Sequence, residues 1–512
     1  MGKSWATFGV DLHLDRSGTG LRRGLTDALR EAVRGGRLAP GTRLPSSRSL
    51  AADLGVARNT VAEVYADLVA EGWLAARQGS GTRVADRTPA IPDGTPATPD
   101  RTPATPVGTP ATPDHRPAPS HPAPSRTPHQ PAPHHPAPHH PAPSHPAPHR
   151  REPGRPAYDL VPGTPELASF PRAQWLRAAR RALTTAPDRA LGYGDPRGRP
   201  ELRTALAGYL SRARGVHADP DGIVVCAGFL GGLGVLAELL RQRGARSVAV
   251  ESYGLPHHRR LLARAGCDTP PLPFDDRGTL PLADPAAAQA ALLTPSHQFP
   301  LGLPLLPERR TALIDWARRT GGLVLEDDYD GELRYDRQPV GALQGLDPDR
   351  VVYLGTASKS LAPALRLGWL VLPPSLVEDA MDCMAGRTPG ALDQLTLAEF
   401  LGSGGYDRHV RAVRLRYRRR RDALVAALAE RAPEVRVTGI AAGLHAVLQL
   451  PPGTEQQAVR AAAWNGLAVH GLSTFRHPEA AVAPLDALVV GYGTPPEHAW
   501  AGALDALCRA LP

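Results

Sequence analysis

The side chain with the most distinctive chemistry in this sequence is that of Lys359. Only two of the 59 basic residues are lysine, Lys3 and Lys359, and all the others are arginine. A guanidinium stays protonated in proteins, whereas a desolvated lysine amine can lose its proton and form a Schiff base with an aldehyde. Lys359 is therefore the candidate catalytic residue, although an arginine-biased composition could also leave one lysine by chance.

Polar residues near Lys359 suit an aldehyde that carries a phosphate. Ser358 precedes the lysine and Arg366 follows it in the segment VVYLGTASKSLAPALRLGW. Both side chains can bind a phosphate, the arginine through charge-assisted hydrogen bonds.

A second phosphate-binding element is predicted at the glycine of VVCAGFLGG. Gly228 ends a strand-like run and precedes a helix-like one. The backbone N–H groups of Phe229 and Leu230 would then lie at a helix N-terminus, which is a natural anion site.

Two further motifs supply groups for a pyridine ring. Asp327 and Tyr329 follow a strand-like run in LVLEDDYDGE, and His297 and Gln298 lie in TPSHQFPLG. The carboxylate would pair with a pyridinium nitrogen, and the other three groups could reach a ring oxygen. Each fragment alone also fits an ordinary turn or a solvated acidic loop. Together, around the only internal lysine, they predict a site for a phosphorylated pyridine aldehyde.

The elements that must position these groups alternate between strand and helix. Six short β-rich runs, GIVVCAG, SVAVES, AALLTPS, GLVLEDD, VVYLGTAS and GWLVLP, are separated in many places by helical stretches. This alternation predicts an α/β fold with a mostly parallel central sheet. Ligands of such sheets bind beyond the carboxyl ends of the strands, where the polar motifs fall.

The first 86 residues predict a separate DNA-binding unit. A helix is expected over 21–34, a second one after Pro45, and a third after the short turn 55–57. The segment WLAARQGSGTRV then reads as a hairpin, so that the whole is a winged helix-turn-helix. A helical protein-interaction module is the alternative. Net charge does not distinguish these two functions, since residues 1–86 hold 12 Lys and Arg against 9 Asp and Glu.

In a winged helix the start of the second motif helix reaches base edges, while flanking groups hold phosphates. The expected base-reading residues are Arg58, Asn59 and Thr60. The expected phosphate-binding residues are Arg43, Ser46, Ser47, Arg48, Ser80 and Thr82.

Residues 87–155 have a different composition and divide the chain into units 1–86 and 156–512. Proline recurs every few residues and large apolar side chains are nearly absent, which predicts a disordered, extended linker. Nine of the 19 histidines lie here, so metal capture or pH sensing is the alternative to a plain spacer.

The chain is expected in the cytoplasm. It has no run of about 18 apolar residues, which a membrane helix would need, and no apolar signal segment at its start. Its four cysteines are scattered without a CxxC pair, so neither a metal centre nor a disulfide framework is predicted.

The N-terminal unit resembles the winged helix of GntR-type bacterial regulators. The motifs that carry the resemblance are RLPSSR at 43–48, LGV at 54–56, RNTV at 58–61 and GSGT at 79–82. The C-terminal unit resembles fold-type I aminotransferases that use pyridoxal 5'-phosphate (PLP). Its motifs are YGDPRG at 193–198, TPSHQ at 294–298, EDDYD at 326–330 and the Ser-Lys pair at 358–359.

Together the two units resemble the MocR-type regulators, which fuse these domains in one chain. The resemblance implies a small C-terminal α+β subdomain, PLP as cofactor, operator DNA as partner and a head-to-tail homodimer in which Tyr193 reaches the other subunit's phosphate. It also implies control of genes of vitamin B6, GABA or related nitrogen metabolism, with PLP or an amino compound as effector.

Three departures bear on the effector. Leu255 stands where the family often has a ring-stacking tyrosine, which Tyr253 or His257 would have to replace, and Leu230 stands where it often has glutamine. The last strand, around 485–491, lacks the arginine that holds a substrate carboxylate in amino-acid-binding relatives, and Arg476 is the nearest candidate. The missing arginine argues against an efficient transaminase and favours PLP itself as effector.

Other functions remain open at this point. The chain could be an active aminotransferase with an accessory DNA-binding domain, or a dimerisation scaffold whose altered pocket no longer holds PLP. The arginine-rich segment 408–421 could be a second DNA surface, but we expect a solvated helix face that packs through Val410, Val413 and Tyr417.

Overall fold

The computed structural model describes residues 156–512 except 283, 285, 336–340 and 385, together with parts of the N-terminal unit. Those parts are 25–26, 29–30, 32–33, 38, 41–42, 44–54, 57–70, 73–77 and 81–85. The predicted linker 87–155 lies outside the described residues. None of the helices described is long and apolar enough to cross a membrane.

The N-terminal unit contains the predicted helix-turn-helix and hairpin. Helix α2 spans Ser47–Leu54, α3 spans Arg58–Ala70, and strands β1 (Leu74–Arg77) and β2 (Gly81–Val84) pair antiparallel. The helices pack through an apolar core that includes Leu50, Val61 and Trp73. The helix expected over 21–34 lies only partly within the described residues.

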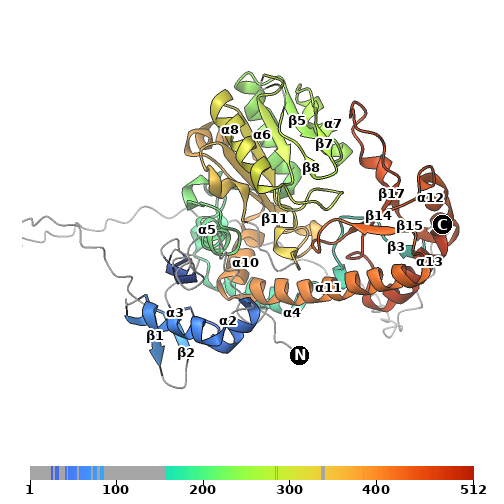
Figure 1. Ribbon diagram of the computed structural model, residues 1–512. Coiled ribbons are helices and arrows are strands. Elements are labelled where there is room, and N and C mark those ends of the chain that lie inside the picture. Colours follow the sequence, from blue (N-terminus) through green and yellow to red (C-terminus); the bar gives the residue numbers. More distant parts are fainter. Residues whose placement is uncertain are drawn as a thin grey trace, which may run out of the picture. The chain divides into compact units, whose positions relative to one another are not determined.

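The C-terminal unit is built on a seven-stranded sheet in the order β4-β12-β11-β10-β9-β5-β6 (Figure 1). Six of these strands are the six predicted runs, and β12 is the one that runs antiparallel to its neighbours. The strands are β4 (Ile223–Ala227), β5 (Val248–Glu251), β6 (Pro271–Leu272), β9 (Ala290–Leu293), β10 (Leu323–Asp327), β11 (Val351–Thr356) and β12 (Leu367–Val371). The short strands β7 (Phe274–Asp275) and β8 (Gly278–Thr279) form a separate hairpin.

Helices cover both faces of this sheet because alternate strand residues point to opposite sides. Leu292 and Leu325 pack in one hydrophobic cluster with α6 and α9, whereas Leu293 and Val324 pack in another with α8. Helices α5 and α10 pack against the end of the sheet that holds β4 and β12. The helices are α4 (Arg172–Thr185), α5 (Pro200–Arg214), α6 (Gly228–Gln242), α7 (Pro256–Arg264), α8 (Pro307–Thr320), α9 (Val377–Met384) and α10 (Ala391–Gly402).

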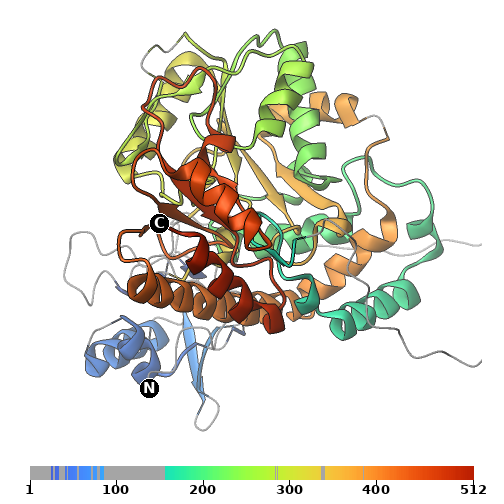
Figure 2. The same cartoon turned by 90° about the vertical axis from the view of Figure 1, so that its right-hand side faces the viewer.

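A smaller α+β subdomain follows, as the resemblance implied. Its antiparallel sheet has the order β13-β14-β17-β16, and β15 pairs with β3. The long helix α11 packs against α13, and Figure 2 shows it along the base of the C-terminal unit. The elements are β3 (Tyr158–Asp159), α11 (Gly405–Arg431), β13 (Arg436–Thr438), β14 (Ala446–Gln449), α12 (Glu455–Trp464), β15 (Leu467–Ala468), β16 (His470–Gly471), β17 (Ala487–Val490) and α13 (Trp500–Ala510).

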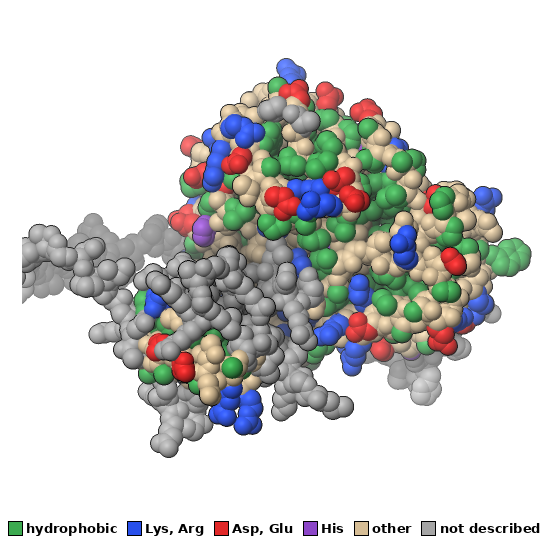
Figure 3. Space-filling model, in the orientation of Figure 1, with side chains coloured by type: hydrophobic (Ala, Val, Ile, Leu, Met, Phe, Trp, Pro, Cys, Tyr) green, Lys and Arg blue, Asp and Glu red, His purple; other side chains and the backbone are tan. Residues whose placement is uncertain are grey.

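Helix α11 carries the arginine-rich segment, and it is a packed helix. Val410, Val413 and Tyr417 are buried as expected. Arg420 differs from the expected solvated face, because it is buried and pairs with Glu166 at 3.2 Å. On the face shown in Figure 3, basic and acidic side chains of the C-terminal unit are interspersed, with no continuous basic surface among the coloured residues.

A buried ion pair joins three segments behind the carboxyl end of the sheet. Arg214, at the end of α5, donates from Nε to Asp328 Oδ2 at 2.6 Å and from Nη2 to Asp328 Oδ1 at 3.0 Å. Its Nη2 also donates to Ser296 Oγ at 3.0 Å, and the Tyr353 hydroxyl donates to Asp328 Oδ2 at 2.8 Å. This network holds the loop after β10 against the loop after β9.

Removing the arginine from this pair should strongly destabilise the fold. Arg214→Leu leaves the Asp328 carboxylate buried without its cation, which costs about 3–5 kcal/mol of the free energy of unfolding. Urea denaturation followed by tryptophan fluorescence measures the loss. The matched control is Arg243→Leu, whose ion pair with Asp379 is about two-fifths exposed on both sides and should contribute less than about 1 kcal/mol. Equal losses in the two variants would contradict the importance of the buried pair.

Candidate functional site

A cavity of about 360 Å³ lies at the carboxyl ends of β4, β5, β9 and β10. This is the edge of the sheet at which the sequence placed its polar motifs. Eight of the predicted site residues line it. They are Gly228, Phe229, Leu230, Asp327, Tyr329, Ser358, Lys359 and Arg366.

Lys359 follows β11 and presents its amine to this cavity. Its Nζ donates to the backbone oxygen of Gly163 at 2.5 Å, across 196 residues of sequence. Gly163 has φ +102°, and a Cβ at this position would lie 3.4 Å from the amine. Burial lowers the pKa of Lys359, while the charges of Asp327 and Asp330 act in the opposite direction. A lowered pKa increases the fraction of neutral, nucleophilic amine.

Asp327 is the last residue of β10 and is buried. Its Oδ1 has no hydrogen-bond partner among the described residues. Burial raises the pKa of this carboxyl well above its ordinary value, and only the opposing charge of Lys359 limits the rise. A buried acceptor without a donor is costly, so this atom is suited to a group that enters the cavity with a proton.

The cavity lining also includes the groups expected for a phosphate. Gly228 begins α6 with φ +72°, and a Cβ at Gly368 would meet the Gly228 backbone at 2.8 Å. Arg366 is exposed and has φ 52°, and its guanidinium makes no hydrogen bond or ion pair to any described residue. Ser358 Oγ accepts from Thr356 Oγ1 at 2.9 Å, which leaves the Ser358 proton available to a ligand.

Two predicted residues, His297 and Gln298, do not line the cavity. Gln298 Nε2 donates to the backbone oxygens of Tyr253 and Phe299, each at 2.8 Å. His297 Nδ1 lies 3.0 Å from the Tyr329 hydroxyl and therefore stands behind the residue that does reach the cavity. Their direct contact with a ring oxygen stays a prediction.

Tyr193 also lies apart from the cavity lining and is fully exposed. An exposed aromatic side chain next to Leu191, which is 59% exposed, suits a contact with another molecule. Its role across a dimer interface stays a prediction.

The departures from the family pattern make the cavity more apolar. Leu255 and Leu230 both line it, and so does His257, whereas Tyr253 is buried and is not among the lining residues. Of the two residues that could replace the missing aromatic ring, the structure therefore places His257 at the cavity.

The sequence did not reveal several cavity residues. They include Gly163, Thr164, Glu251, His258, Thr294, Thr356, Phe299 and His445. Glu251 and Thr294 could have been predicted, because ligands bind at the carboxyl ends of the strands. Glu251 is the last residue of β5, and Thr294 comes directly after β9. Gly163 and His445 come from segments far away in the sequence, which no local pattern links to the lysine.

Arg476 does not line the cavity, and its guanidinium already binds backbone oxygens. Its Nη2 donates to the backbone oxygens of Ala480 at 2.5 Å and Val482 at 2.7 Å. In β17, Val489 packs in an apolar cluster with Phe299. Among the described residues of β17 there is no cation that could bind a substrate carboxylate.

Two family models match this chain. Residues 21–84 match the gntR family of bacterial regulatory proteins, and residues 164–480 match aminotransferase class I and II. The chain is 32% identical over 490 residues to the uncharacterized HTH-type transcriptional regulator YhdI of Bacillus subtilis, covering 93% of each chain. It is 33% identical over 454 residues to the HTH-type pyridoxine biosynthesis transcriptional regulator PdxR of Corynebacterium glutamicum, covering 88% of each.

Two solved structures that share the fold of the C-terminal unit are aminotransferases. An archaeal alanine:glyoxylate aminotransferase has a TM-score of 0.62 at 23% identity, covering 70% of this chain and 91% of the other. The kynurenine aminotransferase of Pyrococcus horikoshii has a TM-score of 0.61 at 24% identity, covering 69% and 90%. These similarities establish the fold of the C-terminal unit.

The aminotransferase class I and II family implies PLP as cofactor, and the residues of this cavity fit it. The unpartnered Oδ1 of Asp327 can accept a hydrogen bond from a protonated ring nitrogen. The unpaired Arg366 guanidinium can bind a phosphate. The Lys359 amine lies in the same cavity as both. The chain belongs to the MocR-type family of HTH-type transcriptional regulators, in which a GntR helix-turn-helix domain and an aminotransferase class I and II domain form one polypeptide.

Proposed function

We propose that this regulator binds PLP covalently through Lys359 and that cofactor or effector binding at 156–512 alters operator binding by 1–86. Segment 87–155 would join the two units. The observation that carries the proposal is the buried, unpartnered Asp327 carboxylate that shares one cavity with the only internal lysine. Burial raises the pKa of this carboxyl, so a cationic or proton-bearing group that enters the cavity would stabilise its anionic form.

When bound, PLP supplies an aldehyde that reacts reversibly with amines and a ring that withdraws electrons from the attached group. Lys359 presents the amine to that aldehyde carbon. Asp327 holds a proton at the ring nitrogen, while Arg366 and Ser358 bind and orient the phosphate. Leu255 and its apolar neighbours exclude water from the ring.

The effector we favour is PLP itself, with genes of vitamin B6 metabolism as targets. The relative from Corynebacterium glutamicum is a pyridoxine biosynthesis regulator by name. The apolar cluster around Val489 offers nothing to bind the carboxylate of an amino acid. An amino compound without a carboxylate is the other candidate, and net release of keto acid from amino acids would show a transaminase instead.

Operator binding is assigned to the exposed start of α3 and its neighbours. Arg58 and Asn59 are exposed on α3, and Arg48 is exposed on α2. Ser46, Ser47, Thr60 and Thr82 are at least partly exposed, whereas Arg43 and Ser80 lie outside the described residues. Because a bacterial operator lies in the cytoplasm, we place the protein there.

We propose a homodimer formed through an apolar face that includes α4. Leu176 and Leu183 are 62% and 53% exposed and lie seven residues apart, which puts them on one side of the helix. Leu191 and Tyr193 extend the exposed apolar surface just beyond α4. Exposed apolar surface of this kind is typical of interfaces.

The first prediction for this function concerns the visible absorption spectrum with added PLP. The wild-type protein should show the band of lysine-bound cofactor, and Lys359→Ala should lose it because the amine is gone. Lys3→Ala, which removes the only other lysine, is the matched control and should keep the band. Absence of a band from all three proteins would leave the cavity without a PLP role.

A second prediction concerns DNA. Arg58→Ala should weaken binding to a duplex selected from a random pool by the wild-type protein by about 5- to 150-fold, the effect of losing 1–3 kcal/mol at a base edge. Fluorescence anisotropy at fixed salt measures this. Arg436→Ala, which removes an exposed arginine of β13, should leave the affinity unchanged. Equal effects in both variants would indicate only a general charge effect.

A third prediction concerns the oligomeric state. Leu176→Asp/Leu183→Asp should convert the dimer to a monomer in analytical ultracentrifugation, because two carboxylates would be buried in the interface. Trp464→Asp is the control, since Trp464 is 92% exposed at the end of α12, outside the proposed face. A dimer that persists in the double variant would place the interface elsewhere.

A further inference from the structure

Two contacts from helix α11 hold the residue that follows Lys359. Ser360 lies in the turn 357–361, and its Oγ is 2.7 Å from the Tyr406 hydroxyl. Its backbone oxygen is 2.7 Å from His409 Nε2. Tyr406 and His409 are three residues apart and therefore lie on the same side of α11. The residue after the lysine is thus joined to this helix through both its side chain and its backbone.

A buried carboxylate determines the direction of the hydrogen bond between Ser360 and Tyr406. The Tyr406 hydroxyl donates to Glu332 Oε1 at 3.2 Å, and all three side chains are buried. A hydroxyl has one proton to donate, so Tyr406 can only accept from Ser360. The three groups therefore form a chain in which Ser360 donates to Tyr406 and Tyr406 donates to Glu332.

The direction of this chain depends on the ionised form of Glu332. Burial, together with the charge of Asp328, raises the pKa of Glu332 to about 7, while the charge of Arg214 acts in the opposite direction. Above that pKa the group is a carboxylate, which only accepts hydrogen bonds. Tyr209 donates to the same oxygen, but its distance of 3.5 Å is long for a bond between two oxygens. Tyr406 is therefore the stronger of the two tyrosine donors to Glu332.

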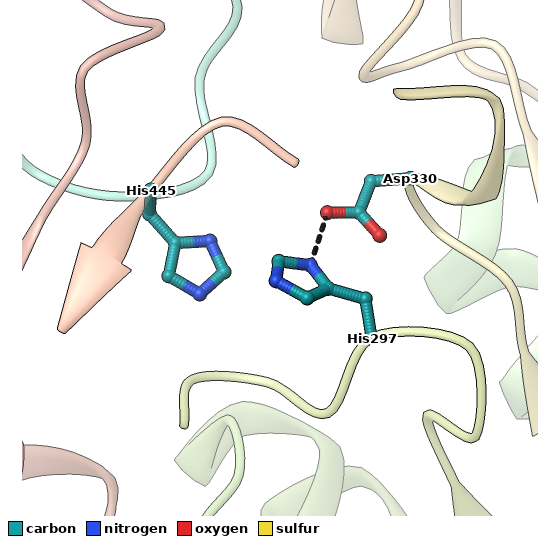
Figure 4. Close-up of side chains that lie close together, drawn as sticks. All are labelled: His297, Asp330 and His445. Atoms are coloured by element: carbon teal, nitrogen blue, oxygen red, sulfur yellow. Dashed lines mark hydrogen bonds and ion pairs between the residues drawn. The ribbon is translucent and has the colours of Figure 1, made fainter. Parts of the chain in front are cut away.

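The loop that carries Glu332 is anchored at further points. In Figure 4, Asp330 and His297 point toward one another, with His445 beside His297, and His297 Nδ1 is 2.8 Å from Asp330 Oδ2. The backbone oxygen of Glu332 accepts from Nε and Nη2 of Arg414, at 2.9 Å and 2.6 Å. Because Arg414 belongs to α11, the same helix fixes the carboxylate and the lysine turn.

We propose that Tyr406 is a positioning residue for Lys359. Its hydroxyl, oriented by Glu332, holds Ser360 and with it the turn from which the lysine amine reaches the cavity. This inference rests on the proposed covalent binding of PLP, in which the lysine nitrogen replaces the aldehyde oxygen, and that oxygen leaves as water with both protons of the neutral amine. Reacting groups must meet in one orientation, and misplacing them is costly. Loss of the Tyr406 hydroxyl should therefore weaken the attachment of PLP without changing the cavity that holds its ring and phosphate.

A comparison of two cofactors tests this role in the full-length protein. Pyridoxamine 5'-phosphate (PMP) has an amine in place of the aldehyde of PLP, so it can fill the same cavity without bonding to Lys359. Tyr406→Phe should bind PLP about tenfold more weakly than the wild-type protein does, and PMP with unchanged affinity. Isothermal titration calorimetry measures both affinities about one pH unit above the pKa of Glu332, where this group is mostly a carboxylate.

Tyr209→Phe is the matched control. The centroids of the Tyr209 and Tyr406 rings are 5.0 Å apart, and the Tyr209 hydroxyl donates to the same Glu332 oxygen. Both variants therefore remove a buried phenol from one carboxylate, but only Tyr406 bonds to Ser360. Tyr209→Phe should leave the affinities for PLP and PMP unchanged. An equal loss of PLP affinity in the two variants would assign the effect to Glu332 and contradict the role of Tyr406.

Ser360→Ala tests the same hydrogen bond from its other end. It should weaken PLP binding by a similar factor, and Tyr406→Phe/Ser360→Ala should bind no more weakly than either single variant, because both substitutions break one bond. Losses that multiply in the double variant would overturn the inference, and so would equal weakening of PLP and PMP, which indicates a distorted cavity. If Tyr406→Phe does not fold, Ser360→Ala decides through the same comparison of PLP with PMP.

The visible band of the wild-type protein separates this inference from the proposed function. If the wild-type protein has no band, covalent binding of PLP itself fails. A normal wild-type band together with unchanged PLP affinity in Tyr406→Phe removes only the positioning role.

Discussion

The candidate site depends on the buried pair between Arg214 and Asp328. Asp328 immediately follows Asp327 and precedes Tyr329, so its bidentate contact with Arg214 fixes the backbone from which both cavity residues project. The same guanidinium reaches Ser296, next to His297. Taking two charges out of water is expensive unless every hydrogen bond is formed, and here a hydroxyl from Tyr353 adds a further one. The strand-end geometry of the site is thus held from behind, by residues that never touch the cavity.

Sequence reasoning located the centre of this site because the parallel sheet obeys a simple rule. Residues at the carboxyl ends of neighbouring strands share one edge, so Asp327 at the end of β10 and Lys359 after β11 had to lie close together. Gly228 followed from the same rule for β4. All six predicted strands are present in the large sheet, and their hydrophobic runs were readable because both faces of the sheet are buried.

The same reasoning gives no signal for contacts that a side chain makes with the backbone or with a distant segment. Gln298 was predicted to bind a ring oxygen, and in the structure its Nε2 donates to the backbone oxygens of its neighbour Phe299 and of Tyr253, which follows β5. Arg420 reads as a solvated charge, yet it is buried against Glu166, 254 residues earlier in the chain. Gly163 contacts Lys359 across 196 residues. Contacts of this range depend on the tertiary fold, and local spacing contains no signal for them.

The arrangement of polar and apolar groups around the cavity also separates binding from turnover. The groups suited to the cofactor are present, namely the Lys359 amine, the Asp327 carboxylate and the Arg366 guanidinium. On the side of β17, Val489 and its apolar neighbours stand in place of a cation for a substrate carboxylate. An enzyme must bind its substrate's transition state tightly, whereas a sensor needs only a ligand that favours one conformation over another. The cavity thus holds the groups suited to a cofactor, while the described residues of β17 provide no cation for a substrate carboxylate.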